Sequence, residues 1–86
     1  MSNADDSPSM ALVVRKDLGL SAGKMAVQCA HAAVSCTMAS RKTNSRLMER
    51  WLNGGARKIC LKVDDLQSLQ QLAGQAQAAG LVTHIV

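Results

Sequence analysis

The spacing of apolar and polar positions predicts six elements along the chain. Residues 11–14 form a short aliphatic run typical of a buried strand, and a helix follows from its N-cap at Ser21 to about Ser40. A second helix is expected from about Thr43 to the Gly54-Gly55 pair. The remaining elements are a strand over residues 58–63, a helix capped by Asp64 or Asp65 that stops at Gly80, and a strand over residues 81–86.

The order strand, helix, helix, strand, helix, strand predicts an α/β fold. We expect a three-layer sandwich in which helices cover both faces of a mostly parallel, twisted sheet. The apolar centre of residues 58–63 predicts a strand covered on both faces. Trp51 is the only aromatic residue, so the core must be aliphatic. Residues 1–10 are interpreted as a disordered polar leader, and residues 11–86 as a single domain.

The first predicted helix carries a file of polar side chains on an otherwise apolar circumference. At about 100° per residue, the side chains that share this line are Lys24, Gln28, His31 and Ser35. A helix that is apolar nearly all round is expected to be buried, and a buried unpaired polar group costs about 1–3 kcal/mol. A cleft for a polar ligand would explain the file, and so would hydrogen bonds to neighbouring backbone.

Positive charge is in excess. Ten Lys and Arg residues against six Asp and Glu residues give a net charge of +4, which is compatible with an anionic partner such as nucleic acid. Lys42, Arg46 and Arg50 follow one another at i,i+4 and form a basic stripe suited to phosphate contacts. An ordinary solvated helix face is the alternative interpretation. The scarcity of aromatic residues disfavours base stacking and leaves phosphate and shape contacts.

Spacing argues against three other chemistries. The loop from Gly19 to Lys24 lacks the glycine spacing, and the Ser or Thr after the Lys, of a nucleotide-binding loop. Cys29 and His31 lie two helical positions apart and point about 200° away from each other, so they cannot act as nucleophile and base. No set of Cys, His and carboxylate residues has ligand spacing, so we predict no metal and no other cofactor.

Cysteine usage and the N-terminal residues bear on the compartment. Cys29, Cys36 and Cys60 are odd in number and include no Cys-x-x-Cys pair, which indicates a reducing compartment rather than a disulfide framework. No apolar run is long enough to span a bilayer, and residues 1–10 resemble neither a secretory signal nor an Arg-rich transit peptide. We expect a cytoplasmic protein without membrane contact, with a mitochondrial location left open.

Several stretches of the sequence together carry a specific signature. They are residues 14–18 (VRKDL), residues 23–32 (GKMAVQCAHA), Trp51, Gly54, residues 58–64 (KICLKVD), Leu66, Leu69 and the Gly80-Leu81 pair. In these stretches, from about Ala11 to the end, the chain resembles the archaeal and eukaryotic type of peptidyl-tRNA hydrolase. The most specific part is the pattern Gly-Lys-x-Ala-x-Gln-x-x-His-Ala.

The resemblance implies a hydrolase that cleaves the ester between a peptide and the 3′ ribose of tRNA, which recycles tRNA from aborted translation without a metal. It implies that Lys24 is a functional residue, with Gln28 and His31 on the same face as further catalytic residues. Asp17 matches an acidic position in the loop before the helix. Water would be the nucleophile and peptidyl-tRNA the partner, and the basic stripe would contact the tRNA.

One departure from the family accompanies this resemblance. Members continue after the third strand with a segment containing Asp-x-Gly-x-Thr and a fourth strand, which has no counterpart in residues 1–86. We therefore expect a C-terminally truncated domain with an unpaired sheet edge, which favours a homodimer or edge-strand association. The alternative function is a catalytically incomplete fragment that binds tRNA or a protein.

Overall fold

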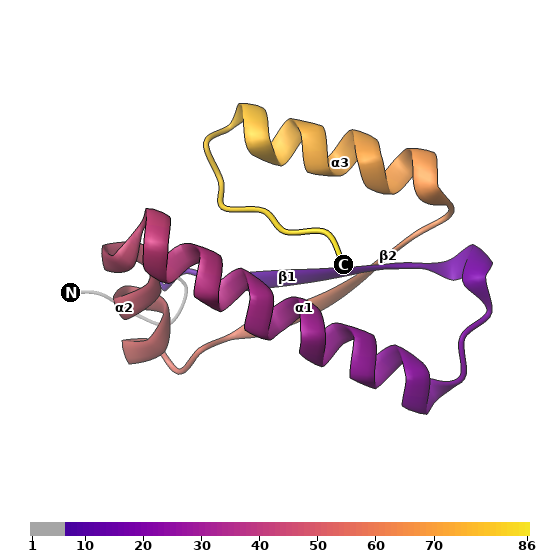
Figure 1. Cartoon of the computed structure of the whole chain (residues 1–86), viewed down its shortest axis with the longest axis horizontal. Helices are drawn as coiled ribbons and strands as arrows, with labels where there is room; N and C mark the ends of the chain where they lie inside the picture. The colour runs from indigo at the N-terminus through magenta and orange to yellow at the C-terminus, as the bar shows by residue number, and fades with distance from the viewer. Residues whose placement is uncertain (1–6) are drawn as a thin grey trace.

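The computed structural model describes residues 7–86, which form an α/β fold (Figure 1). Its elements are β1 (Met10–Arg15), the short 3-10 helix η2 (Lys16–Leu18), α1 (Ala22–Thr43), α2 (Ser45–Asn53), β2 (Lys58–Val63) and α3 (Leu66–Ala78). β1 and β2 pair in parallel, from Met10 beside Lys58 to Arg15 beside Val63. The predicted α/β class and the order of the first five main elements are confirmed. Of the expected leader, residues 1–6 lie outside the described part of the chain, and Met10 already belongs to β1.

Each main helix begins at a side chain that caps it. Ser21, Asn44 and Asp65 each accept a hydrogen bond from the backbone N–H three residues further on, at 3.3, 3.2 and 2.8 Å. Asn44 also ends α1, because its φ of −155° and ψ of 72° leave the helical region. α1 therefore runs past the predicted end at Ser40 to Thr43, since no residue interrupts the helix before Asn44.

The core is small and is built around Trp51. Within the described residues, the buried hydrophobic side chains are Met10, Leu12 and Trp51, which are 9%, 8% and 8% exposed. The indole N–H of Trp51 donates to the carbonyl of Arg57 at 2.8 Å, and the Lys58 ammonium lies 5.2 Å from the ring centre. The residues of α1 that pack against this core are Cys29, Ala32, Ala33 and Cys36.

Two expectations about burial are wrong. No residue of α1 is buried, and Val34 is 63% exposed. In β2, every residue except Val63 is exposed, whereas a strand covered on both faces was predicted. The physical reason is the width of the sheet. The two strands found in the described part of the chain offer a narrow surface, so one stripe of α1 has apolar neighbours and the rest faces outward.

The strand predicted over residues 81–86 is also absent. This segment runs back from α3 toward the strands in an extended path (Figure 1), but it pairs with neither β1 nor β2. Gly80, with φ of 80°, turns the chain out of α3, and the Leu81 N–H donates back to the carbonyl of Ala76 at 3.0 Å. Apolar composition alone does not make a strand, because a strand also needs a neighbour for its ladder hydrogen bonds.

Candidate functional site

The candidate site lies where α1 begins. Lys24 and Gln28 are one helical turn apart, and both line a cavity of about 1040 Å³. The Ser21 cap fixes this end of α1, because its hydroxyl accepts from the Lys24 backbone N–H. A helix N-terminus carries partial positive charge, and the Lys24 ammonium adds a full charge beside it. This end of the cavity is therefore suited to an anionic group.

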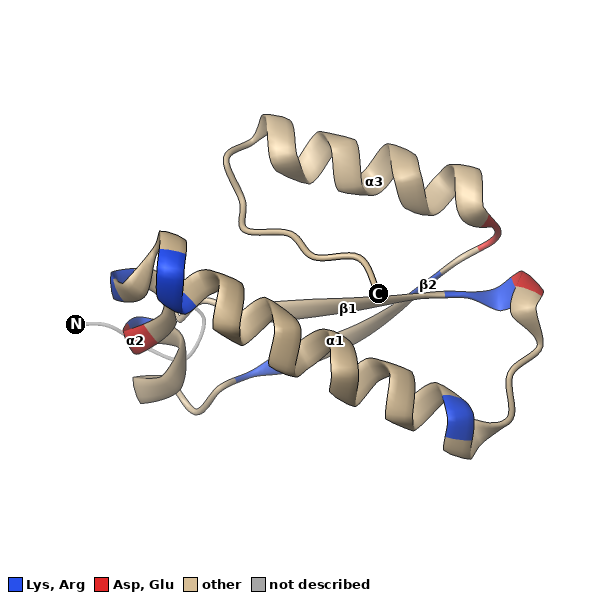
Figure 2. Ribbon diagram, viewed as in Figure 1, with Lys and Arg blue, Asp and Glu red and all other residues tan. Residues whose placement is uncertain are grey.

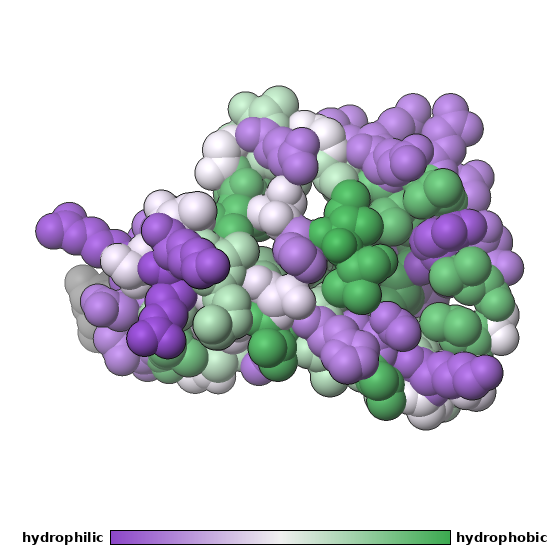
Figure 3. All heavy atoms as spheres, in the orientation of Figure 1, coloured by the Kyte–Doolittle hydropathy of each residue, from purple (hydrophilic) through white to green (hydrophobic). Residues whose placement is uncertain are grey.

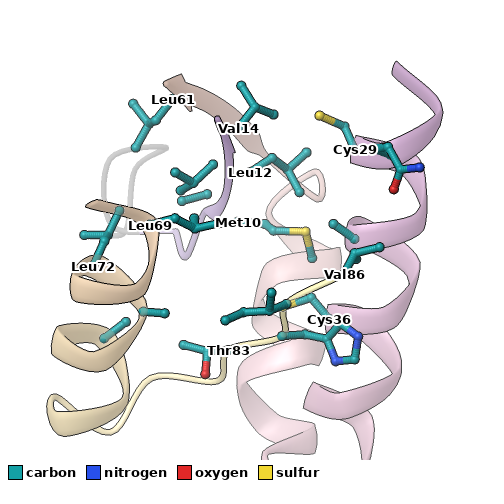
Figure 4. A pocket seen from close by; sticks show the side chains of 18 of the residues that line it. Met10, Leu12, Val14, Cys29, Cys36, Leu61, Leu69, Leu72, Thr83 and Val86 are labelled. Carbon is teal, nitrogen blue, oxygen red and sulfur yellow. The ribbon is translucent and has the colours of Figure 1, made fainter. Parts of the chain in front are cut away.

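Most of the cavity wall is apolar. Figure 4 shows side chains from β1, α1, α3 and the C-terminal segment directed toward a common space. The labelled residues among them include Leu12 and Val14 from β1, Cys29 and Cys36 from α1, Leu69 and Leu72 from α3, and Thr83 and Val86. Apolar residues also reach the surface near the middle of one face of the molecule (Figure 3). An apolar cavity with a few polar groups at one end is the usual form of a binding site for an organic ligand.

The loop after β1 is held by a forked ion pair. The Arg15 Nε and Nη2 donate to the two carboxylate oxygens of Asp17 at 3.0 and 2.7 Å. This hydrogen-bonded pairing lowers the pKa of Asp17 and raises the pKa of Arg15. Lys16 bridges to Asp64 at 3.1 Å, which connects the loops that follow the two parallel strands. Asp64 is therefore an ion-pair partner, while Asp65 caps α3.

The four predicted catalytic residues do not all line the cavity. Lys24 and Gln28 do, whereas His31 and Asp17 are absent from its lining. His31 is exposed on α1, and Asp17 is exposed in η2, where it is occupied by Arg15. Lys24, Gln28 and His31 of the polar file are thus exposed and Ser35 is half-buried, so the file does not carry the cost of full burial that the sequence pattern suggested.

The predicted basic stripe lies at the other end of α1. Lys42, Arg46 and Arg50 are all exposed. The expected single helix face is wrong, because the break at Asn44 leaves Lys42 on the last turn of α1 and places Arg46 and Arg50 on α2. Basic segments accordingly appear near both ends of α1 in Figure 2. Eighteen residues separate Lys24 from Lys42, which is about 27 Å along a helix at 1.5 Å per residue.

The sequence did not reveal two residues of the candidate site, Arg41 in the basic region and Arg15 beside Asp17. Arg41 precedes Lys42 in the last turn of α1 and is exposed, but it falls outside the i,i+4 spacing that revealed the stripe. Its position directly before Lys42 was the available signal. Arg15 was missed because its fork with Asp17 depends on the 3-10 turn of η2, which no spacing rule predicts.

Residues 7–86 show neither a metal-binding cluster nor a membrane-spanning helix. In this range, three or more His, Cys, Asp or Glu side chains do not gather in a group able to hold a metal ion. Among the described helices, none combines the length and the apolar character that crossing a bilayer requires.

Comparison with known proteins places the chain in a family. The family model described as Peptidyl-tRNA hydrolase PTH2 matches residues 9–86. The peptidyl-tRNA hydrolase of Thermoplasma acidophilum is 43% identical over 77 residues, which cover 90% of this chain and 66% of that protein. Peptidyl-tRNA hydrolase 2 of Saccharomyces cerevisiae is 41% identical over 83 residues, covering 90% of this chain and 40% of that protein.

A third relative gives the same result. The probable peptidyl-tRNA hydrolase 2 of Schizosaccharomyces pombe is 39% identical over 83 residues, covering 96% of this chain and 40% of that protein. The chain thus spans between 40% and 66% of the length of these three relatives. The resemblance found in the signature from Gly23 to Ala32 is confirmed by the family model, and the chain belongs to the peptidyl-tRNA hydrolase PTH2 family.

Proposed function

We propose that this chain acts on peptidyl-tRNA and hydrolyses the ester bond between the peptide and the 3′ ribose, which frees tRNA from aborted translation. The observation that carries the proposal is the position of Lys24 and Gln28, side by side at the capped start of α1 and on the wall of the cavity. Membership of the family supports it, because the relatives are named for this activity.

In the proposed mechanism, water attacks the ester carbonyl carbon. The carbonyl oxygen gains negative charge, and the Lys24 ammonium together with the N-terminal end of α1 stabilises that charge. Gln28 lies one turn further along α1, where its side-chain amide can orient the attacking water. Collapse of the tetrahedral intermediate breaks the bond to the ribose oxygen, and a peptide carboxylate and a free 3′ hydroxyl result.

Asp17 and His31 receive roles according to their surroundings. The lowered pKa of Asp17 makes its carboxylate a weak proton acceptor, so we assign it to positioning Arg15 and the loop before α1. His31 follows Lys24 by seven residues, which is close to two helical turns, and therefore continues the same face. It is exposed beyond the cavity, and we assign it to contact with the substrate outside the cavity.

The basic stripe extends the proposed contact to the tRNA backbone. Lys42, Arg46 and Arg50 are exposed, and they lie far enough from Lys24 to contact phosphates while the 3′ end occupies the cavity. Such contacts are independent of base identity, which suits an enzyme that accepts many tRNAs. We further propose a cytoplasmic location; a bovine relative that is 38% identical carries the word mitochondrial in its name, which keeps that compartment open.

The direct test is cleavage of an N-blocked aminoacyl-tRNA by the chain and by Lys24→Ala. We expect the substitution to lower kcat by about 10²-fold or more, as removal of one group that stabilises an oxyanion does elsewhere. Lys62→Ala is the matched control, since Lys62 is an exposed lysine on β2 outside the cavity lining. Equal rates for Lys24→Ala and the parent would refute the assigned site. Binding of tRNA without turnover would instead support the alternative, a tRNA-binding module.

A further inference from the structure

Two of the three cysteines, one on α1 and one on β2, lie on the same side of the sheet. Cys60 of β2 is the register partner of Leu12 in β1, and register partners in a sheet direct their side chains to the same face. Cys29 of α1 packs against the core that contains Leu12, so it approaches this same face of the sheet. Burial raises the pKa of the Cys29 thiol, and interaction with the neighbouring Cys60 raises it further. The two thiols thus lie on the same side of the sheet and close enough to interact, although they are 31 residues apart in the sequence.

Both thiols are free and accessible. Cys60 is exposed, and Cys29 is partly buried; neither forms a disulfide in the structure. We propose that Cys29 and Cys60 form a reversible oxidation site, in which a low-molecular-weight disulfide such as oxidised glutathione converts the two thiols into a bond between α1 and β2. The proposal is independent of the proposed hydrolysis, because it rests only on the positions of these two side chains.

The exchange proceeds in two balanced steps. The exposed Cys60 thiolate attacks one sulfur of oxidised glutathione, the glutathione S–S bond breaks, and one glutathione thiolate leaves. Cys29 then loses its proton to water and attacks the Cys60 sulfur of the mixed disulfide, which releases the second glutathione thiolate. The two cysteines are oxidised, one disulfide is reduced to two glutathione molecules, and the leaving thiolates take up the two protons.

The bond would tie the helix of the candidate site to the exposed strand. Cys29 follows Gln28 directly and lies five residues after Lys24, so the disulfide would restrain this part of α1 against β2. Closing the loop between residues 29 and 60 also restricts the unfolded chain, which is expected to raise the melting temperature.

Cys36 provides the matched control within the same helix. It is partly buried like Cys29 and packs on the same core, but it lies about 10 Å further along α1. Helical residues so far apart cannot be bridged, because a disulfide requires Cα atoms within about 7 Å. In an unfolded chain, however, Cys29 and Cys36 close the shortest loop and are favoured as partners. The folded and unfolded chains are therefore expected to form different disulfides.

The experiment equilibrates the full chain with mixtures of reduced and oxidised glutathione, quenches it with acid and maps the products by mass spectrometry. We expect loss of two hydrogen atoms, a Cys29–Cys60 peptide link, a free thiol at Cys36 and a raised melting temperature. Cys36→Ser should form the same link, while Cys60→Ser should yield only mixed disulfides with glutathione. In urea, the link should shift to Cys29–Cys36.

Three results would overturn the proposal: a folded chain that forms only mixed disulfides, one that links through Cys36, or one that links only between molecules. A second measurement tests the proposal even if Cys60→Ser does not fold. In Cys36→Ser, which retains both proposed partners, the equilibrium constant for disulfide formation should exceed its value in urea by about tenfold or more. Equal constants in the two conditions would show that the fold does not bring the thiols together.

Discussion

Arg15 and Asp17 form a forked ion pair across the turn that leaves β1, with N–O distances of 3.0 and 2.7 Å. The pair joins the end of a strand to the loop that leads into the candidate site. Both residues are reached by solvent, so the pair adds little stability and salt is expected to weaken it. Its main effects are to hold the loop after β1 in place and to keep Asp17 charged.

The pH dependence of this pair has a definite sign. Its hydrogen bonds lower the pKa of folded Asp17, so its contribution to stability is complete above the unfolded pKa and is lost as the pH falls through the folded pKa. Arg15→Gln should raise the pKa of Asp17 toward its ordinary value. Titration of the side-chain carboxyl signals by NMR measures this. The pKa of Asp65 should change less, because hydrogen bonding to Ser68 lowers it more than the charge of Arg15 does. An unchanged midpoint for Asp17 would contradict the role given to Arg15.

The cap at Ser21 supplies a second prediction. Ser21→Ala removes the hydroxyl that accepts from the Lys24 N–H, and is expected to lower the free energy of unfolding by about 1 kcal/mol. Ser21→Asp keeps an acceptor at the same place and should retain most of the stability. Urea titration followed by circular dichroism distinguishes the two. Equal loss in both variants would show that the cap does not stabilise α1.

The same residues show what local sequence can predict. Ser21 and Asp65 cap the starts of α1 and α3 through hydrogen bonds to nearby backbone, and Gly80 turns the chain out of α3. Because these interactions are local, the start of α1 and both ends of α3 could be predicted from the sequence. The burial of a side chain and the pairing of a strand depend instead on which elements pack against them in the folded chain. Within residues 7–86, the apolar residues 81–86 resemble a strand but pair with no other strand, and the outward side of α1 is uncovered because the described sheet has two strands.

The candidate site shows the same division. The signature from Gly23 to Ala32 identified Lys24 and Gln28 as a pair, because one helical turn places them side by side. The sequence could not predict that Asp17 is held by Arg15, since that contact arises from the 3-10 turn. Nor could it predict that His31 lies outside the cavity, which depends on how α1 meets β1 and α3.

Trp51 is expected to dominate the stability of this small core. Trp51→Ala removes a buried ring and leaves a cavity, at a cost of about 3–5 kcal/mol, which is a large share of the stability of a domain this small. Leu52→Ala is the control, because the neighbouring Leu52 side chain is 49% exposed and should cost far less. Thermal melting by circular dichroism measures both. Similar melting temperatures for the two variants would contradict a core centred on Trp51.

The basic stripe predicts a salt-dependent affinity for tRNA. If Lys42, Arg46 and Arg50 each neutralise a phosphate, replacing all three by Gln should reduce the slope of log K against log salt by about 2–3. Fluorescence anisotropy with labelled tRNA at several salt concentrations provides the slopes. Lys62→Gln should leave the slope nearly unchanged. A triple variant with the parental slope would show that these residues face solvent without contacting tRNA.

The apolar C-terminal segment predicts concentration-dependent association. Leu81, Ile85 and Val86 line the open cavity and are still 60%, 55% and 65% exposed, and exposed apolar side chains that lie close together promote self-association. Sedimentation velocity should show the average mass rising with concentration, and Ile85→Lys should suppress the rise because a charge would have to be buried in the contact. Val34→Lys on α1 is the control: it changes charge equally at a side chain that is 63% exposed on a different element. Equal suppression by both variants would indicate general charge repulsion, whereas suppression by Ile85→Lys alone locates the contact at the C-terminal segment.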